Sequence, residues 1–193
     1  MTIAPASPGT APSDAEIRAL AARLDRPVVL VGMMGAGKTS VGRRLAQLLS
    51  LRFADADEAI EAAARMSVAD IFERFGEAAF RDGERRVIAR LVTKGPGIVA
   101  TGGGAFVQDE TRALILERGI AVWLDSDLDT LVERVRRKDN RPLLREGDPA
   151  DILARLKQER EPFYAQAPIR VASAAGPHSN TVLRIVQALA AWI

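Results

Sequence analysis

The stretch GMMGAGKT at residues 32–39 constrains this chain more than any other, because it matches the phosphate-binding loop pattern G-x-x-x-x-G-K-[ST]. The β-branched apolar run Val28–Val31 before it predicts a buried strand, and residues 38–49 after it have helical periodicity. In this context the glycines let backbone N–H groups turn inward, and the helix N-terminus attracts anions. The sequence therefore predicts a site for nucleotide phosphates rather than a chance glycine turn.

Two side chains of this loop are expected to act on the nucleotide directly. Lys38 should reach the β- and γ-phosphates, and the Thr39 hydroxyl should ligate Mg²⁺. The guanine-reading motif N-K-x-D does not occur in the sequence, which favours ATP over GTP. The loop thus indicates ATP with Mg²⁺ but leaves the reaction class open.

The chain alternates between strands and helices. We predict strands at residues 28–31, 51–54, 97–101, 120–124 and 169–171. We predict helices at residues 38–49, 57–64, 68–74, 77–93, 109–117, 127–137, 149–161 and 180–192. Such alternation is typical of an α/β fold, in which helices cover both faces of a parallel sheet.

The first 26 residues are expected to form an N-terminal extension. Residues 1–12 are rich in Pro, Ala, Ser and Thr, a composition typical of disorder. The sequence SDAE at residues 13–16 is a capping-box pattern, which predicts a short helix over residues 14–24. Because no repeat or second boundary is evident, residues 27–193 are predicted to form one domain.

The composition excludes several classes of site. There are no cysteines and only one histidine, His178, so disulfides, thiolate sites and multi-histidine metal sites are excluded. No apolar run reaches the ~18–20 residues of a membrane span, and the N-terminus lacks the features of a signal peptide. The net charge of +2 makes no strong case for a nucleic-acid or membrane partner. We therefore expect a cytoplasmic protein that acts on small molecules.

A second carboxylate for Mg²⁺ has more than one candidate. Asp55 and Asp57 follow a predicted strand, and alternate residues at a strand end point the same way, so the two could share one site. One would then hold metal while the other acts as a base toward a hydroxyl. The alternative is that they only cap the following helix. Asp125 also ends an apolar run, but we interpret it as a cap for the next helix.

Three further features suggest an acceptor site. Arg81 and Glu84 are three residues apart on a predicted helix and can pair, although the same spacing occurs in ordinary surface ion pairs. Three glycines at residues 102–104 follow a strand, where they either let a ligand approach the backbone or form a plain turn. Arg160 lies near a helix end, and its two-pronged guanidinium suits a carboxylate.

The basic segment at residues 134–145 has two interpretations. It is either a solvated helix end or a mobile lid that brings an arginine onto the transferring phosphoryl group. A nucleic-acid surface is less favoured, because the run contains no aromatic residue on which bases could stack.

Taken together and in order, the motifs GMMGAGKTSVGRRLA, FADADEAIE, FRDGE, VATGGGAF, NRPLL and EREPFY resemble those of the shikimate kinase family. The phosphate loop alone is generic, but the ordered set is specific, and the resemblance covers residues 27–192. It implies a P-loop fold of the nucleoside-monophosphate-kinase type, an open five-stranded parallel sheet of order 2-3-1-4-5. It also implies ATP-dependent phosphorylation of the 3-hydroxyl of shikimate, on the route to chorismate and the aromatic amino acids.

The resemblance also implies roles for the acceptor residues. Arg81 and Arg160 would clamp the shikimate carboxylate, with Glu84 orienting Arg81. Asp57 would accept hydrogen bonds from the shikimate hydroxyls and act as base or only orient the hydroxyl, while Asp55 would support Mg²⁺ together with Thr39. The acceptor-binding region would span about residues 56–84, and the pocket would also be lined by Gly102, Gly103 and Gly104.

On the nucleotide side, the family pattern implies a lid at about residues 138–148. Arg141 in this lid would touch the γ-phosphate, Arg134 would stack on adenine, and Pro177 would flank it. Lys38, Asp57 and Arg141 would be the catalytic residues. The residues that would bind ATP are Gly35, Ala36, Gly37, Lys38, Thr39, Ser40, Arg134, Arg141 and Pro177.

Two rival functions are weighed against this one. A kinase for another hydroxy acid, such as gluconate, could use the same scaffold and the same paired arginines, although F-R-x-x-E and T-G-G-G argue against it. A non-catalytic nucleotide-binding module would be expected to lack Lys38, Asp55, Asp57 or the lid arginine, and all are present. We expect the protein to be a monomer.

Overall fold

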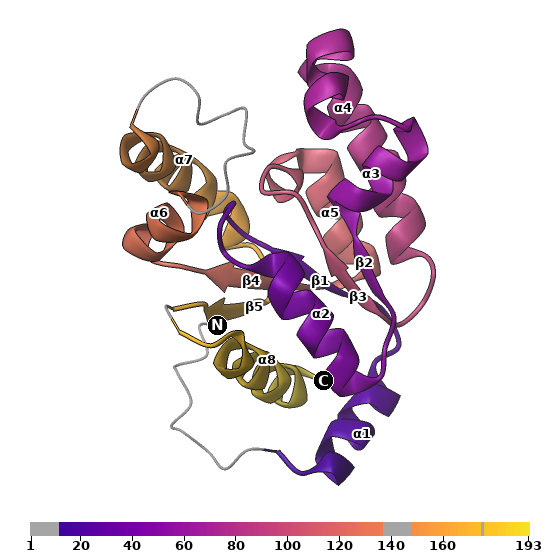
Figure 1. Ribbon diagram of the computed structural model, residues 1–193. Helices are drawn as coiled ribbons and strands as arrows, with labels where there is room; N and C mark the ends of the chain where they lie inside the picture. Colours follow the sequence, from indigo (N-terminus) through magenta and orange to yellow (C-terminus); the bar gives the residue numbers. More distant parts are fainter. Residues whose placement is uncertain (1–11, 137–147, 175) are drawn as a thin grey trace.

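A single five-stranded parallel sheet organises the molecule (Figure 1). The computed structural model describes residues 12–136, 148–174 and 176–193. The strands are β1 (Val28–Val31), β2 (Phe53–Asp55), β3 (Ile98–Ala100), β4 (Ile120–Asp125) and β5 (Ile169–Ala172). Their order is β2-β3-β1-β4-β5, which confirms the order expected from the family resemblance.

The central strand β1 is apolar throughout because it is buried on all sides. It pairs in parallel with both β3 and β4, so that Val29 lies between Val99 and Ala121. All four of its residues are buried. Because neighbours and covering helices leave it no solvated face, its sequence is a continuous apolar run rather than an alternating one. The loop that follows β1 therefore starts from the most constrained part of the sheet.

Helices cover the sheet on both sides. In Figure 1, α2 and α8 lie in front of the sheet and α5 lies behind it, while α3 and the first half of α4 stand beside its β2 edge. The helices are α1 (Asp14–Arg23), α2 (Lys38–Leu49), α3 (Ala56–Ala64), α4 (Val68–Val92), η1 (Ala105–Val107, a 3₁₀ turn), α5 (Asp109–Arg118), α6 (Leu128–Arg136), α7 (Pro149–Tyr164) and α8 (His178–Trp192).

Helix α4 bends where the sequence predicts a break. Two helices were expected, at residues 68–74 and 77–93, and α4 consists of two helical segments that meet at a kink between these ranges. The bend is at Gly76, whose φ of +77° and ψ of 174° are not helical. A residue with a Cβ rarely adopts such a φ, so glycine suits this bend. The two halves of α4 can thus take different directions beside α3.

Helix α1 is part of the packed structure. Its predicted capping box is present, with Ser13 and Glu16 exchanging hydrogen bonds. Its apolar side buries Ile17 and Leu20, and the helix contacts both α2 and α8. The N-terminal extension therefore contributes to the hydrophobic core, and residues 1–11, where disorder was predicted, lie outside the described residues.

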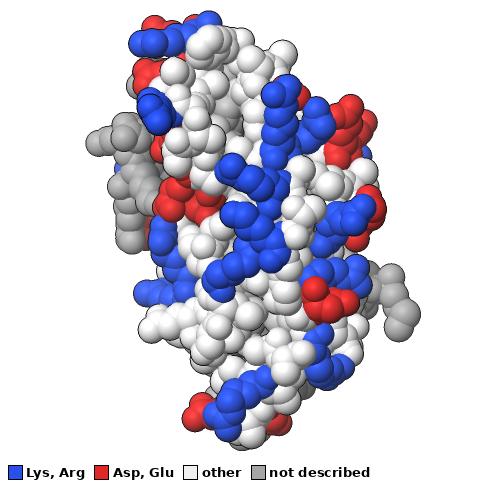
Figure 2. All heavy atoms as spheres, turned by 90° about the vertical axis from the view of Figure 1, so that its right-hand side faces the viewer, with Lys and Arg blue, Asp and Glu red and all other residues white. Residues whose placement is uncertain are grey.

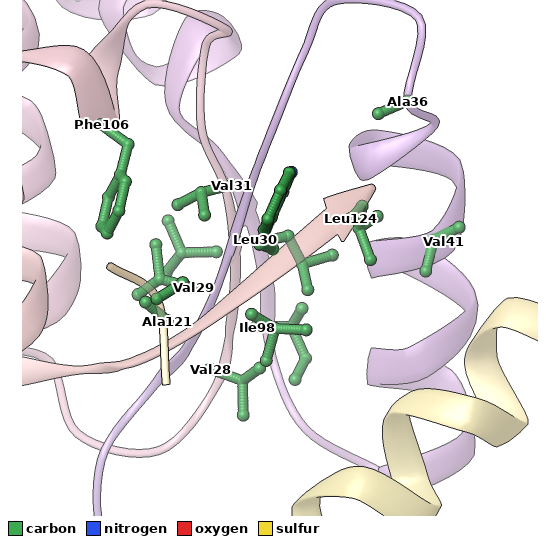
Figure 3. Packing of buried hydrophobic residues seen from close by; sticks show 14 of the residues in the cluster. Val28, Val29, Leu30, Val31, Ala36, Val41, Ile98, Phe106, Ala121 and Leu124 are labelled. Atoms are coloured by element: carbon green, nitrogen blue, oxygen red, sulfur yellow. The ribbon is translucent and has the colours of Figure 1, made fainter. Parts of the chain in front are cut away.

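The buried core runs through the middle of the sheet. Figure 3 shows Val28, Leu30, Ile98, Ala121 and Leu124 packed together between the helices. Basic side chains gather on the surface at the α3–α4 side of the molecule, as Figure 2 shows. Within the described ranges, no helix combines the length and apolar character needed to cross a membrane.

Candidate active site

The phosphate-binding loop connects β1 to α2, as the sequence predicts. Gly32, Gly35 and Gly37 all have positive φ, at +132°, +84° and +88°. A Cβ on Gly32 would lie 2.6 Å from the Leu124 carbonyl oxygen, so no larger residue fits there without displacing backbone. Because glycine adopts positive φ without steric cost, these positions give the loop its turn.

Lys38, the first residue of α2, bends back over the loop. Its Nζ donates hydrogen bonds of 2.8 Å to the Gly32 and Met33 carbonyl oxygens, and the residue is only 8 % exposed. Hydrogen bonds in which both partners are charged are stronger than those to neutral carbonyls. Phosphate oxygens placed in this loop can therefore compete for the Lys38 ammonium.

Thr39 and Asp55 bring two hard oxygen ligands together. The Thr39 hydroxyl donates to Asp55 Oδ2 at 2.7 Å, while Asp55 Oδ1 accepts the Asp57 and Glu58 backbone N–H groups at 3.0 and 3.4 Å. Asp55 is thus the N-cap of α3 and also a neighbour of the phosphate loop, so the capping and metal-binding interpretations are compatible.

This pair fits Mg²⁺, which commonly takes one or two protein oxygens and completes its octahedron with phosphate oxygens and water. Among the described residues, no group of three or more Asp, Glu, His or Cys could form an all-protein metal cage.

The side chains of Asp57 and Asp55 do not point the same way. The prediction that they would, as alternate residues of one strand, is wrong. The strand ends at Asp55 and helix α3 begins at Ala56, so the alternation of a strand does not extend to Asp57. Asp55 points toward Thr39, whereas a Cβ on Gly102 would lie 2.9 Å from Asp57 Oδ1 and 3.0 Å from Glu84 Oε1. The two aspartates therefore face different parts of the site.

Arg81 and Glu84 form a buried pair rather than an ordinary surface one. Arg81 Nη1 donates to Glu84 Oε2 at 2.7 Å, and Glu84 is 1 % exposed. Burial raises the pKa of Glu84, Arg81 opposes this shift, and the charges of Asp57 and Glu77 add to it. Glu84 Oε1 is buried and has no hydrogen-bond partner within the described residues. Glu84 thus fixes Arg81 beside the glycines.

The three consecutive glycines gather the predicted acceptor residues. A Cβ on Gly104 would lie 2.6 Å from Arg81 Nη2, and one on Gly103 would lie 3.7 Å from Arg160 Nη1. The same Gly103 position is 3.1 Å from the backbone nitrogen of Met34, in the phosphate loop. Acceptor residues from α3, α4 and α7 therefore meet beside the nucleotide loop.

Tyr164 is a residue of this region that the sequence did not single out. Its hydroxyl donates to the Gly103 carbonyl oxygen at 2.5 Å, and its side chain is 1 % exposed. Burial raises its pKa to about 12, against the opposing effect of Arg160 and Arg81. It ties the end of α7, which carries Arg160, to the glycine turn. Its place at the end of EREPFY was the only available signal.

A second group of residues lies beside Gly37 of the phosphate loop. A Cβ on Gly37 would lie 3.6 Å from Arg134 Nη1 and 3.1 Å from His178 Cε1. Arg134 also donates to the Ala174 carbonyl oxygen at 2.8 Å. Burial and the charges of Arg134 and Arg44 lower the pKa of His178. His178 was not predicted to be a site residue. Pro177, which was, is the N-cap of α8 and directly precedes it.

The predicted lid is not tested by the structure, and the predicted role of Asp125 is wrong. Arg141 and residues 138–147 of the predicted lid lie outside the described residues. Asp125 is not a helix cap, because β4 continues through it and its carboxylate bonds Lys157 at 3.1 Å and Arg170 at 2.7 Å. Asp127 instead accepts the Thr130 backbone N–H at 2.7 Å.

Known proteins of one enzyme family are similar to this chain over nearly its whole length. A family model described as shikimate kinase matches residues 34–190. The chain belongs to the shikimate kinase family. A shikimate kinase of Novosphingobium aromaticivorans is 62 % identical over 185 residues, covering 94 % of this chain and 96 % of the relative.

Solved structures agree with this membership. A shikimate kinase from Acinetobacter baumannii, solved in complex with shikimate, superposes with a TM-score of 0.83 at 35 % identity and covers 91 % of this chain and 96 % of its own. A gluconokinase from Sinorhizobium meliloti has a TM-score of 0.56 at 19 % identity, with 88 % and 94 % covered. That second likeness shows a common fold alone, so it does not strengthen the gluconate alternative.

Proposed function

We propose that this chain transfers the γ-phosphoryl group of ATP to the 3-hydroxyl of shikimate, giving shikimate 3-phosphate and ADP. The observation that carries the proposal is the meeting of Asp57, Arg81 and Arg160 around glycines 102–104, directly beside the phosphate loop. The shikimate complex of the Acinetobacter baumannii relative supports the choice of acceptor. Such a step lies on the route to chorismate and the aromatic amino acids.

The acceptor is held by its carboxylate and oriented through its hydroxyls. Arg81 and Arg160 approach Gly104 and Gly103, where their forked guanidinium groups can each donate to a carboxylate. Glu84 fixes the direction of Arg81. Asp57, next to Gly102, accepts a hydrogen bond from the reacting hydroxyl. This bond directs the hydroxyl oxygen toward the γ-phosphorus.

The reaction forms one bond and breaks one. The shikimate hydroxyl oxygen bonds to the γ-phosphorus, the bond from that phosphorus to the β–γ bridging oxygen breaks, and ADP leaves. The hydroxyl proton passes to Asp57 or is lost to solvent. Positioning of this kind contributes several kcal/mol, up to about 7–11 in ideal cases.

The nucleotide is held by the loop and by residues around it. Lys38 and the N–H groups of residues 35–40 bind phosphates, with Thr39 and Asp55 as the protein ligands of Mg²⁺. When bound, Mg²⁺ neutralises charge on the β- and γ-phosphates. Arg134 and Pro177 border the adenine. The family resemblance implies that Arg141, outside the described residues, would contact the γ-phosphate and that the predicted lid would exclude water from the reaction.

A coupled assay of ADP release tests the function. With ATP and Mg²⁺ present, release should depend strongly on shikimate and should not respond to gluconate. Release that is unaffected by shikimate would overturn the acceptor assignment while leaving the phosphate loop intact. Release stimulated by gluconate would favour the rival acceptor.

The remaining expectations concern assembly and location. We propose a cytoplasmic monomer that needs no nucleic acid or membrane. Sedimentation velocity across a range of protein concentrations tests the monomer, because a second species that grows with concentration would contradict it.

A further inference from the structure

An apolar groove opens on the outer side of α3 and α4, away from the reacting groups. It has a volume of about 450 Å³ and is lined by Ile60 and Ala63 of α3, Ile71 and Phe75 before the bend in α4, and Gly83 after it. Small-molecule sites commonly have volumes of ~300–1,000 Å³ and mostly apolar walls. The groove therefore has the size and chemistry of a ligand site.

Part of the apolar lining of the groove is exposed, while Ile60, Ile71, Phe80 and Val87 form its buried floor. Phe75 is 60 % exposed, and Ala63, Ala64 and Ala79 of the lining are also exposed. Single exposed apolar residues are ordinary, but here the exposed residues lie next to buried apolar ones in one hollow. Within the described residues, no other element of the chain covers this surface.

Gly83 gives an independent reason to regard the groove as a site. It lies within the second half of α4, where a glycine costs roughly 1 kcal/mol relative to alanine. Its φ is not in the left-handed region, and a Cβ placed there would have no described atom within 4 Å. Neither backbone geometry nor crowding therefore requires glycine, and the effect of its missing side chain is to keep the groove open.

The charge at the groove selects the kind of ligand. Arg86 and Arg90 are one turn apart on α4 and line the groove, whereas the described lining residues include no acidic one. Arg86 pairs with Asp82, but the Arg90 guanidinium makes no ion pair with any described residue. Figure 2 shows basic side chains gathered on this side of the molecule.

We propose that this groove binds a small amphipathic anion, an aromatic carboxylate with a flat apolar body. The aromatic body would lie against Phe75 and Phe80 between the small residues of the two helices. The carboxylate would meet Arg90, whose fork can donate two parallel hydrogen bonds. This site stands independently of the proposed kinase reaction.

The groove is separate from the acceptor pocket. Phe80 lines the groove, is 4 % exposed and packs against Phe72 with tilted rings and 4.4 Å between the ring centroids. The guanidinium of the next residue, Arg81, lies over the Phe80 ring at 5.2 Å from its centroid and reaches toward Gly104. A ligand in the groove would therefore contact α4 behind the residues that hold the acceptor.

Fluorescence titration with 8-anilinonaphthalene-1-sulfonate, an aromatic anion, tests the proposal on the full chain. We expect saturable binding of one probe per chain that survives saturating shikimate. Gly83→Leu should fill the groove and weaken binding tenfold or more, with Gly83→Ala intermediate. Arg90→Gln should weaken it about tenfold, the scale of a hydrogen bond to a charged group. Arg18→Gln, an equal charge change on α1, should have no effect.

Three results would overturn the proposal. Binding that Gly83→Leu leaves unchanged would place the probe elsewhere, and displacement by shikimate would place it in the acceptor pocket. A dimer that Gly83→Leu dissociates would show that a second copy fills the groove. Unchanged kinase turnover and a thermal unfolding temperature no lower than that of the parent, measured for each variant, verify that the variants are folded; Gly83→Ala should unfold at a slightly higher temperature because alanine favours the helix.

Discussion

The two halves of the active site are encoded in different ways. The phosphate-binding part of the nucleotide half is one continuous segment, residues 32–40, in which strand end, loop and helix start follow each other. The acceptor half is assembled from α3, α4, the glycine turn after β3, and α7, which are far apart in sequence. A site on one segment loses activity mainly through changes of its own residues. A site built from separate elements also loses activity when those elements move relative to one another. The variants below test that difference.

The largest effect is expected in the local half. Lys38→Met removes the only ammonium of the loop, and loss of such a charge-stabilising donor typically costs about 10²–10³ in turnover. We expect kcat to fall by about a thousandfold, as measured by ADP release. Lys94→Met, at an exposed position, is the control and should keep full activity. Turnover within tenfold of the parent would mean that Lys38 only stabilises the loop.

Substitutions of Asp55 and Asp57 should affect the nucleotide half and the acceptor half of the site separately. Asp57→Asn should lower kcat by about a hundredfold or more, the scale of a lost base or orienting group, without changing the Mg²⁺ requirement. Asp55→Asn should instead raise the Mg²⁺ concentration needed for half-maximal rate. Asp125→Asn should change neither quantity. If Asp57→Asn shifted the Mg²⁺ dependence, the separation of the two carboxylates would be contradicted.

Arg160 tests the acceptor half alone. Arg160→Ala should raise KM for shikimate by about 10–100-fold, the scale of a hydrogen bond between charged groups, and leave KM for ATP unchanged. Arg155→Ala, an exposed arginine on the same helix, is the matched control. A rise in KM for ATP would move Arg160 to the nucleotide side.

Tyr164 sharpens the comparison because it acts through other residues. Tyr164→Phe keeps the ring but loses the bond to the Gly103 carbonyl, which is worth about 1 kcal/mol. We expect KM for shikimate to rise severalfold while kcat changes less. Equal falls in kcat with both KM values constant would contradict a positioning role for the hydroxyl.

The smallest expected effect concerns pH. Burial raises the pKa of Glu84 above its unfolded value, so the folded state binds more protons between the two pKa values. The free energy of unfolding should therefore decrease as pH rises through that window. Glu84→Gln should flatten this decrease in urea unfolding measured from pH 4.5 upward. A wild-type stability that rises over the same window would contradict the sign of the shift.

The sequence predicted the local half well and the assembled half only by resemblance. The strand–loop–helix context of Lys38 and Thr39 is readable because glycine spacing and apolar periodicity are local properties. The sheet order and the meeting of Asp57, Arg81 and Arg160 depend on long-range packing, so motif resemblance was needed to propose them.

The errors have physical causes of the same kind. Asp57 was grouped with Asp55 because the exact end of β2 cannot be judged from a short strand. Asp125 was assigned as a cap because Lys157 and Arg170, its actual partners, come from α7 and β5. His178 and Tyr164 were missed because a single residue without a motif gives no signal until its neighbours are known.

The order of the sheet also affects how the chain is made. Val28 pairs with Ile98 and Ile120, which lie 70 and 92 positions further along the chain. At ~5–20 residues per second of synthesis, the ribosome needs several seconds or more to supply these partners. Throughout that interval the apolar β1 segment has no strand to pair with. The strand that anchors the phosphate loop is therefore open to non-native association of its apolar side chains during translation.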